Sequence, residues 1–152
     1  MKSMFTVKVP VQVNAPIASS FQSGTEKLPA VVFSHGLTAN AMMYTVICKE
    51  LASWGLAVFA LDHHDYSCGY TINIDTKEEI KFDTDYAFGD SEKRKEQLGT
   101  RIKEVNGIFE MLKAPSVGRS LFNNKDLKFD LDKLVVCGHS FGAITAMSYA
   151  FE

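Results

Sequence analysis

Apolar and polar positions follow one another along the chain in patterns that predict several β-strands. Residues 5–13 alternate, with the apolar side chains on one face, which predicts a half-buried strand, and Pro10 favours an edge position for it. Continuous apolar runs at 30–33 and 56–61, and the run that follows Lys133 in a strand expected at 133–137, are typical of strands that are covered on both faces. The segments between these three runs contain apolar positions at helical spacing. We therefore expect the runs to be parallel strands joined by helices.

A different spacing predicts the longest helix. In residues 91–113, large apolar side chains recur at intervals of four and three, which is typical of a helix with one buried face, and Pro115 and Gly118 are expected to break it. The stretches 62–90 and 114–132 show neither spacing, and we expect them to be irregular connections. The apolar stripe consists of Leu98, Ile102, Val105, Phe109 and Leu112.

A shorter helix is expected after the first buried run. Its apolar positions recur between residues 43 and 54, Thr38 or Asn40 is placed to cap its start, and Gly55 is placed to end it. Strand, helix and strand in this order form one right-handed parallel crossover. The chain therefore predicts the α/β class, with a doubly wound, mostly parallel sheet that has helices on both faces.

The segment Gly138-His139-Ser140-Phe141-Gly142 joins the last apolar run to a helix-forming run, which is the context of a nucleophile elbow. We expect Ser140 to sit on a strained turn, with the two glycines leaving room for it. The Phe141 N–H begins the helix, has no intrahelical partner and is therefore a candidate oxyanion donor. The alternative is a glycine-flanked serine in an ordinary strand-to-helix turn.

A second motif, His35-Gly36-Leu37, follows the first buried run. If the 30–34 strand lies between the other two, this motif comes beside Ser140, at the carboxyl ends of two neighbouring parallel strands. Ligands of doubly wound sheets bind beyond these ends, where the winding reverses. The Leu37 N–H would then be a second oxyanion donor, opposite Phe141. A plain turn after a strand is the alternative interpretation of His35-Gly36.

Composition narrows the possible functions. Of the 152 residues, 46% are hydrophobic and 22% are charged, and the net charge of -2 offers no polybasic surface for nucleic acid. No apolar run reaches the ~18 residues of a spanning helix, and residues 1–5 lack the apolar core of a signal peptide. The cysteines Cys48, Cys68 and Cys137 favour free thiols and a reducing compartment such as the cytoplasm.

Two segments contain residue types that bind metals. In His63-His64-Asp65, neighbouring residues would have to chelate one ion from one backbone, and no further ligand cluster is near. The segment Asp83-Thr84-Asp85 resembles the start of a calcium loop, but the glycine and the final glutamate are not at the required positions. We therefore expect no metal site.

With both motifs, the chain resembles the α/β-hydrolases, and more closely the platelet-activating factor acetylhydrolases, the family of the lipoprotein-associated phospholipase. The resemblance runs from Val31 to about Met147. The segments that carry it are Phe33-Ser34-His35-Gly36-Leu37, Asp62-His63-His64-Asp65-Tyr66-Ser67, Arg94-Lys95-Glu96-Gln97 with Arg101, Asp126-Leu127-Lys128-Phe129-Asp130, and Gly138-His139-Ser140-Phe141-Gly142.

The resemblance implies which residues act and on what. Ser140 matches the family's nucleophile, and Leu37 and Phe141 match its oxyanion donors, without a metal or organic cofactor. The implied substrate is a phospholipid whose second-position acyl ester is short or oxidised, and association with a membrane or lipoprotein surface is not visible in the sequence. Two departures are Ala143, where a second glycine is usual, and His64, where arginine is usual; the latter leaves the substrate preference open.

A serine nucleophile needs a histidine base and an orienting carboxylate, and this fold places both after the serine. Residues 141–152 contain no histidine, and their carboxylate, Glu152, would lie about 18 Å along a helix from Ser140. His63 and His64 are alternative bases that precede the serine. We therefore expect residues 1–152 to be a single, incomplete α/β-hydrolase domain, truncated after the nucleophile elbow and inactive alone.

Two other functions remain open at this point. The chain is alternatively a catalytically dead hydrolase fragment or scaffold domain, which lacks the rest of the triad. It is alternatively a generic carboxylesterase that acts on esters other than phospholipids. A strand followed by an aspartate and a later histidine, beyond residue 152, would favour an enzyme over a scaffold.

Overall fold

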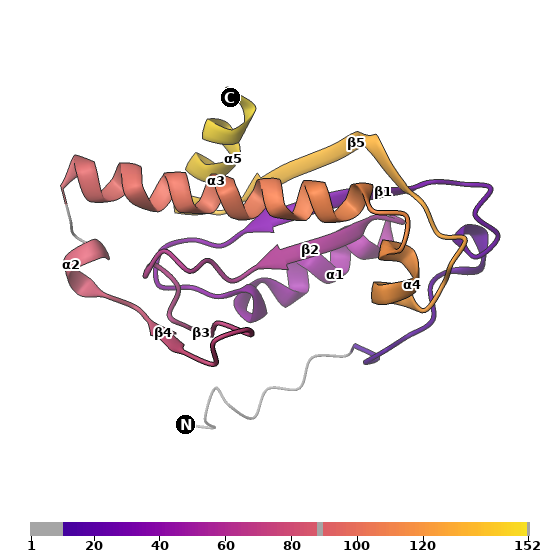
Figure 1. Ribbon diagram of the computed structural model, residues 1–152, viewed down its shortest axis with the longest axis horizontal. Coiled ribbons are helices and arrows are strands. Elements are labelled where there is room, and N and C mark those ends of the chain that lie inside the picture. The colour runs from indigo at the N-terminus through magenta and orange to yellow at the C-terminus, as the bar shows by residue number, and fades with distance from the viewer. Residues whose placement is uncertain (1–10, 88–89, 152) are drawn as a thin grey trace.

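A three-stranded parallel sheet forms the centre of the computed structural model, which describes residues 11–87 and 90–151 (Figure 1). The strands are β1 (Leu28–Ser34), β2 (Ala57–Leu61) and β5 (Phe129–Gly138), in the order β2-β1-β5. Both neighbours of β1 run parallel to it. This confirms the expectation that the first buried strand lies between the other two.

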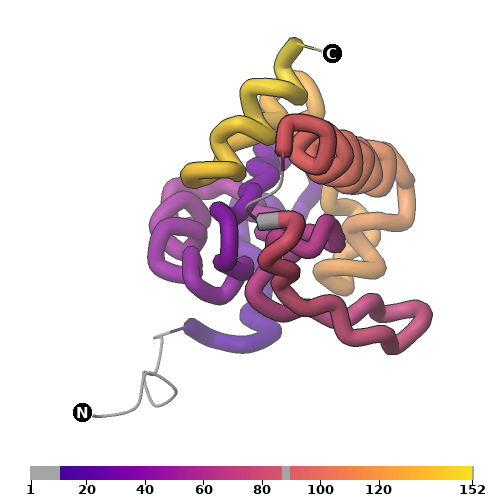
Figure 2. Tube along the Cα trace, turned by 90° about the vertical axis from the view of Figure 1, so that its left-hand side faces the viewer, coloured from indigo at the N-terminus to yellow at the C-terminus, as the bar shows by residue number. Residues whose placement is uncertain are grey.

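Helices cover both faces of the sheet. Helix α1 (Thr45–Ser53) contacts β2, whereas α3 (Ser91–Lys113) and α5 (Phe141–Ala150) contact each other and β5. In the end-on view of Figure 2, the strands lie between α1 on one side and α3 on the other. The bounds of α3 are those predicted from its apolar stripe, of which Ile102, Val105 and Leu112 are buried.

Side chains and turns set the ends of these helices. Asn40 accepts a hydrogen bond from the Met43 N–H at 3.3 Å and caps the short 3-10 helix η3 (Ala41–Tyr44), which runs directly into α1. Gly55 follows α1 with a φ of 83°, a left-handed conformation that favours glycine. At the start of α3, the Asp90 carboxylate accepts from two backbone N–H groups of the first turn.

The expected irregular connections contain regular structure. Residues 62–90 include an antiparallel hairpin of β3 (Tyr70–Ile72) and β4 (Glu79–Lys81), followed by the short helix α2 (Thr84–Ala87). The strands are three residues long, which is too short for alternation to reveal them from the sequence.

Residues 114–132 were likewise expected to be irregular, and they contain helix α4 (Val117–Phe122). Gly118 lies inside this helix and does not break it. A Cβ on Gly118 would come within 2.7 Å of the Asn124 and Leu127 carbonyl oxygens, so the glycine allows α4 to pack closely on the following loop.

The predicted strand at 5–13 is not found where it can be examined. Residues 5–10 lie outside the described residues, and residues 11–13 form no strand. Val11 and Val13 are 51% and 80% exposed, whereas one face of a packed strand would be buried. The first regular element described is instead a 3-10 helix, η2 (Ser19–Phe21).

The buried core lies between β1 and the helices that cover it. It includes Leu28, Ala30, Ala57, Leu112, Val117, Leu127 and Phe129. The apolar positions expected on the helix at 43–54 do not face this core: Met43 in η3, Ile47 in α1 and Trp54 directly after α1 are 66%, 49% and 79% exposed. Among the described residues, no helix is long and apolar enough to cross a bilayer.

Candidate active site

The two sequence motifs meet at the carboxyl edge of the sheet. Ser34, the last residue of β1, pairs with Gly138, the last residue of β5. The His139 N–H donates to the Ser34 carbonyl oxygen at 3.2 Å. This register brings the turn that contains Leu37 beside the turn that contains Ser140.

Ser140 has the backbone conformation expected of an elbow. Its φ is 54° and its ψ is -117°, values that a non-glycine residue rarely adopts, and it is the N-cap of α5. Its side chain is exposed. The strained turn therefore presents the Ser140 hydroxyl to solvent above the end of the sheet.

The two flanking glycines are required by close backbone contact. A Cβ on Gly138 would lie 2.5 Å from both the Ser34 carbonyl oxygen and the Gly142 carbonyl carbon. A Cβ on Gly142 would lie only 2.0 Å from the same Ser34 oxygen. The elbow thus packs directly on the end of β1, and no side chain fits at either position.

Three backbone N–H groups at this edge of the sheet have no hydrogen-bond partner among the described residues. The N–H groups on either side of Leu37 donate to the Tyr44 hydroxyl and the Ser67 carbonyl. In the elbow, the N–H groups of Gly142 and Ala143 donate to carbonyls. Among the hydrogen bonds of the described residues, none comes from Leu37, Ser140 or Phe141 N–H. These amides are therefore available to a bound group.

The candidate nucleophile opens into a hollow. Leu37, Ser140 and Phe141 line one open hollow of about 640 Å³ together with Arg94, Leu98 and Ile144. Its walls are mostly apolar, and one arginine contributes charge. The two predicted oxyanion donors and the predicted nucleophile therefore share one space, which is large enough for an ester and its acyl group.

Tyr44 links the two motifs, a role that sequence reasoning missed. Its hydroxyl accepts from the Gly36 N–H at 3.0 Å and lies 2.9 Å from Nδ1 of His139. The tautomer of His139 decides which of the two groups donates in this second bond. No motif marks this tyrosine in the sequence, where it is one aromatic residue in a helix.

A buried arginine from α3 lies beneath both motifs. Arg101 is 0% exposed, and its Nε donates to the Asp65 carboxylate at 2.6 Å. One terminal nitrogen donates to the His35 carbonyl oxygen at 2.9 Å and to the Thr145 hydroxyl at 3.3 Å. The guanidinium carbon lies 4.2 Å from the centre of the Phe141 ring. The sequence showed Arg101 in the resemblance but gave it no role.

Asp65 is held as a carboxylate by these contacts. Burial opposes its ionisation, but Arg101 and the Ser67 hydroxyl, which donates at 2.5 Å, hold its pKa below the usual value. Ser67 also accepts from the other terminal nitrogen of Arg101. Gln97 binds the Asp65 carbonyl oxygen from the preceding turn of α3, at 3.0 Å. The loop that follows β2 is thereby fixed to α3.

The side chain of His63 is hydrogen-bonded to residues other than Ser140. Its Nε2 lies 2.7 Å from the Ser34 hydroxyl, and its Nδ1 lies 2.5 Å from the Glu104 carboxylate. The side chain is 0% exposed. Burial and the charge of Arg101, which outweigh the nearby carboxylates of Asp65 and Asp62, lower the pKa of His63 to about 2.

The other three histidines are also engaged elsewhere. His35 donates from Nδ1 to the Gly36 carbonyl at 2.7 Å, accepts at Nε2 from the His63 N–H, and has a pKa lowered by burial. His64 lies 4.0 Å from Glu104, and His139 binds Tyr44. Among the described residues, none hydrogen-bonds to the Ser140 hydroxyl. The expectation about Glu152 concerns a residue outside the described part of the chain.

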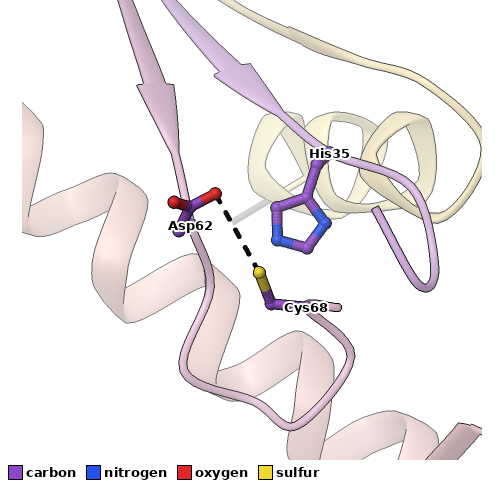
Figure 3. Close-up of side chains that lie close together, drawn as sticks. All are labelled: His35, Asp62 and Cys68. Carbon is purple, nitrogen blue, oxygen red and sulfur yellow. Dashed lines mark hydrogen bonds between the residues drawn. The ribbon is translucent and has the colours of Figure 1, made fainter. Parts of the chain in front are cut away.

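One group of potential metal ligands converges among the described residues. Donor atoms of His35, Asp62 and Cys68 lie within 4.8 Å of one another (Figure 3). Both ring nitrogens of His35 are already hydrogen-bonded, and Asp62 accepts from the Ala41 N–H at 2.6 Å. Burial raises the pKa of the Cys68 thiol to about 11, so it is protonated at neutral pH. These residues fit a hydrogen-bonded core and not a metal centre.

The segments His63-His64-Asp65 and Asp83-Thr84-Asp85 have structural partners of their own. The side chains of His63 and Asp65 point to different partners, Glu104 with Ser34 for the first and Arg101 with Ser67 for the second. The Asp83 carboxylate accepts from the Asp85 N–H at 2.8 Å, at the start of α2. In neither segment do these side chains converge on a common position, as the ligands of one metal ion would.

Known proteins share the pattern of this chain. The platelet-activating factor acetylhydrolase of Cavia porcellus is 32% identical over 162 residues, which cover 97% of this chain and 36% of that protein. That of Bos taurus is 34% identical over 146 residues, covering 84% of this chain and 33% of that protein. A putative phospholipase A2 of Schizosaccharomyces pombe is 30% identical over 148 residues, which cover 78% of this chain and 34% of that protein. The chain spans about a third of the length of these relatives.

A solved structure supports the architecture. The ferulic acid esterase from Streptomyces cinnamoneus matches with a TM-score of 0.64 and 23% identity, over 84% of this chain and 34% of that one. Together with the parallel sheet and its helices, this likeness shows the α/β-hydrolase fold. A sequence profile of the family described as platelet-activating factor acetylhydrolase, isoform II, matches residues 1–152. The chain, matched by this profile from end to end, belongs to that family.

Proposed function

We propose that this chain is the nucleophile-bearing part of a serine esterase of the platelet-activating factor acetylhydrolase type. The observation that carries the proposal is one hollow lined by the exposed Ser140 together with Leu37 and Phe141, whose N–H groups have no hydrogen-bond partner among the described residues. Acyl transfer from an ester needs a nucleophile and donors for the oxyanion. Family membership supports the same chemistry.

The reaction proceeds by acyl transfer through Ser140. The hydroxyl oxygen attacks the ester carbonyl and loses its proton to a base, while the Leu37 and Phe141 N–H groups stabilise the negative oxygen. The intermediate collapses, the alcohol leaves with a proton, and an acyl-enzyme remains on Ser140. Water then attacks the acyl-enzyme and releases the acid. These steps require neither a metal ion nor an organic cofactor.

The base and its orienting acid are proposed to come from outside residues 1–152. The contacts of the four histidines support this. The side chains of His35, His63 and His139 are hydrogen-bonded to other partners, and that of His64 lies 4.0 Å from Glu104. The length of the relatives supports it too, because the chain matches about a third of each. The described residues thus form an incomplete α/β-hydrolase domain, and the complete protein supplies the rest of the triad.

The proposed substrate is a phospholipid with a short or oxidised acyl ester at the second glycerol position. The names of the relatives, an acetylhydrolase in Cavia porcellus and a putative phospholipase A2 in Schizosaccharomyces pombe, support this class. The apolar walls of the hollow beside Ser140 fit an acyl chain or a lipid surface.

The proposal is tested by the substrate profile of the full-length protein in the presence of a chelator. We expect cleavage of a phosphatidylcholine with a second-position acetyl group, and slow or no cleavage when that acyl chain is long. Ser140→Ala should abolish this turnover. Turnover restricted to small soluble esters would favour the generic carboxylesterase, and absence of turnover on either would favour a scaffold domain.

A matched control separates loss of the nucleophile from a general effect of removing a serine. Ser53 ends α1, and its exposed hydroxyl donates to the Glu50 carbonyl oxygen at 2.7 Å. Ser53→Ala should keep wild-type turnover on the acetyl substrate. Normal turnover by Ser140→Ala would contradict the proposal directly.

A further inference from the structure

We propose that Arg101 is a positioning residue that fixes the spacing of the two oxyanion donors, acting through the His35 carbonyl on one side and through Thr145 and the Phe141 ring on the other. The inference rests on the proposed function, because it assigns Leu37 and Phe141 as the donors. It adds a role for a buried side chain that never meets the substrate.

The first set of Arg101 contacts holds the turn after β1. The shortest bond of the terminal Nη1 group runs to the His35 carbonyl oxygen, at 2.9 Å. His35 lies two residues before Leu37, and the turn between them is also held by Tyr44 and by the Thr38 N–H bond to Ser67. Arg101 therefore holds the root of the segment that carries the first donor.

The second set of Arg101 contacts holds the first turn of α5. The same Nη1 group donates to the Thr145 hydroxyl at 3.3 Å, and this hydroxyl donates to the Phe141 carbonyl oxygen at 3.1 Å. The guanidinium carbon also lies over the Phe141 ring, 4.2 Å from its centre. Both contacts hold the residue whose N–H is the second donor.

Only a forked side chain can make all of these contacts together. Nη1 has two N–H groups for three acceptors, the His35 carbonyl, Thr145 and the Ser34 hydroxyl at 3.3 Å. Meanwhile Nε and Nη2 bind Asp65 and Ser67, which keep the guanidinium in one orientation. A lysine is a point charge with a single nitrogen and cannot reach both turns while remaining paired with Asp65.

A purely structural ion pair between α3 and Asp65 is the competing explanation. It predicts that changes at Thr145 alter only the fraction of folded protein. A positioning role predicts slower chemistry in the folded fraction, because the donors interact with the oxyanion more strongly in the transition state than with the bound ester. The two explanations therefore differ in kcat per functional active site, and not in yield or thermal midpoint.

The experiment compares Thr145→Val with Thr145→Ser in the full-length protein. Valine matches threonine in shape and removes only the hydroxyl, whereas serine retains it. Thr100→Val is the matched control, because the exposed Thr100 hydroxyl makes the same bond to the carbonyl four residues earlier, at 3.2 Å to Glu96, without touching Arg101. Active sites are counted by titration with a fluorophosphonate, and kcat and KM are measured on an activated ester.

We expect Thr145→Val to lower kcat per titrated site by about tenfold with KM unchanged. Thr145→Ser should retain most of the wild-type kcat per titrated site. Arg101→Lys should lower it further, by about a hundredfold. Thr100→Val should match the wild type.

Equal kcat per titrated site in Thr145→Val and Thr100→Val would overturn the inference, even if Thr145→Val folds less well. That result would leave the proposed function intact, because the wild type would still turn over. A wild-type protein that neither reacts with the fluorophosphonate nor turns over would overturn the proposed function, and the inference with it.

Discussion

At the scale of single residues, the candidate site depends on how closely the elbow packs on the end of β1. The Ser34 carbonyl oxygen contacts the backbone at both glycines, and Ser140 adopts its strained conformation between them. The spacing of these glycines around the serine could be predicted from the sequence, because the turn leaves no room for side chains there. The partner on β1 could not, since it depends on how two distant strands align.

Gly142→Ala is therefore expected to destabilise the protein by about 3 kcal/mol or more, because its Cβ would stand 2.0 Å from the Ser34 carbonyl oxygen. Gly107 is the control: it lies on an exposed turn of α3, and a Cβ there would meet nothing within 4 Å. Gly107→Ala should stabilise the protein by about 0.5–1 kcal/mol. Urea unfolding measures both, and similar values for the two variants would contradict the close packing.

At the scale of elements, α3 has two roles and the sequence revealed one. Its apolar stripe predicted the helix and its buried face. Gln97, Arg101 and Glu104 lie on the same helix at intervals of four and three, and they bind the loops that follow β1 and β2. Polar residues in a helix usually face solvent, so only the tertiary structure shows that these three are turned inwards.

The short elements were predicted least well, for a related reason. The hairpin at residues 70–81 and helix α4 are held by turns and by packing on their neighbours, and their spacing is too brief to show a period. The strand expected at 5–13 is the opposite case. Its alternation is clear, but at residues 11–13 no neighbouring strand pairs with it.

The buried histidines that join these elements predict a pH dependence of stability. Burial lowers the pKa of His35 and His63 in the folded protein, so both stay neutral while the unfolded chain takes up protons below its ordinary value of 6.5. The free energy of unfolding should be unaffected by these groups above pH 6.5. Below it, both histidines should lower that free energy, and the slope due to His63 should approach about 1.4 kcal/mol per pH unit.

His63→Gln isolates one of the two contributions. We expect the variant to lose less stability than the wild type between pH 6.5 and 5.5, by about 1 kcal/mol, although it is less stable at neutral pH. Burial raises the pKa of Glu104, so the folded protein takes up this proton at a higher pH than the unfolded chain does. Protonation of Glu104 therefore offsets part of the loss of stability at lower pH. Chemical unfolding at the two pH values gives the slopes, and parallel slopes would show that His63 is not held neutral.

At the scale of the whole molecule, the described residues form a sheet of three strands whose outer surfaces are partly apolar. Strand β5 has β1 on one side and no described strand on the other. Val135 on β5 is 51% exposed, and Met147 and Phe151 at the end of the chain are 63% and 87% exposed. An unpaired strand edge beside apolar side chains is a surface for association.

Residues 1–152 produced alone are therefore expected to self-associate and to show no serine-dependent esterase activity. Light scattering coupled to size-exclusion chromatography measures the first property, and hydrolysis of an activated ester beside the Ser140→Ala variant measures the second. A monodisperse monomer with robust Ser140-dependent turnover would show that a base is present within these residues.

The central claim is that Ser140 is the nucleophile of an esterase, and covalent labelling tests it most directly. Full-length protein is treated with a fluorophosphonate, digested and examined by mass spectrometry. We predict one modified serine, Ser140, in the peptide that contains Gly138-His139-Ser140-Phe141-Gly142, with loss of ester hydrolysis in proportion to its modification. An active protein whose label is found on a different serine, while Ser140 stays unmodified, would contradict the claim.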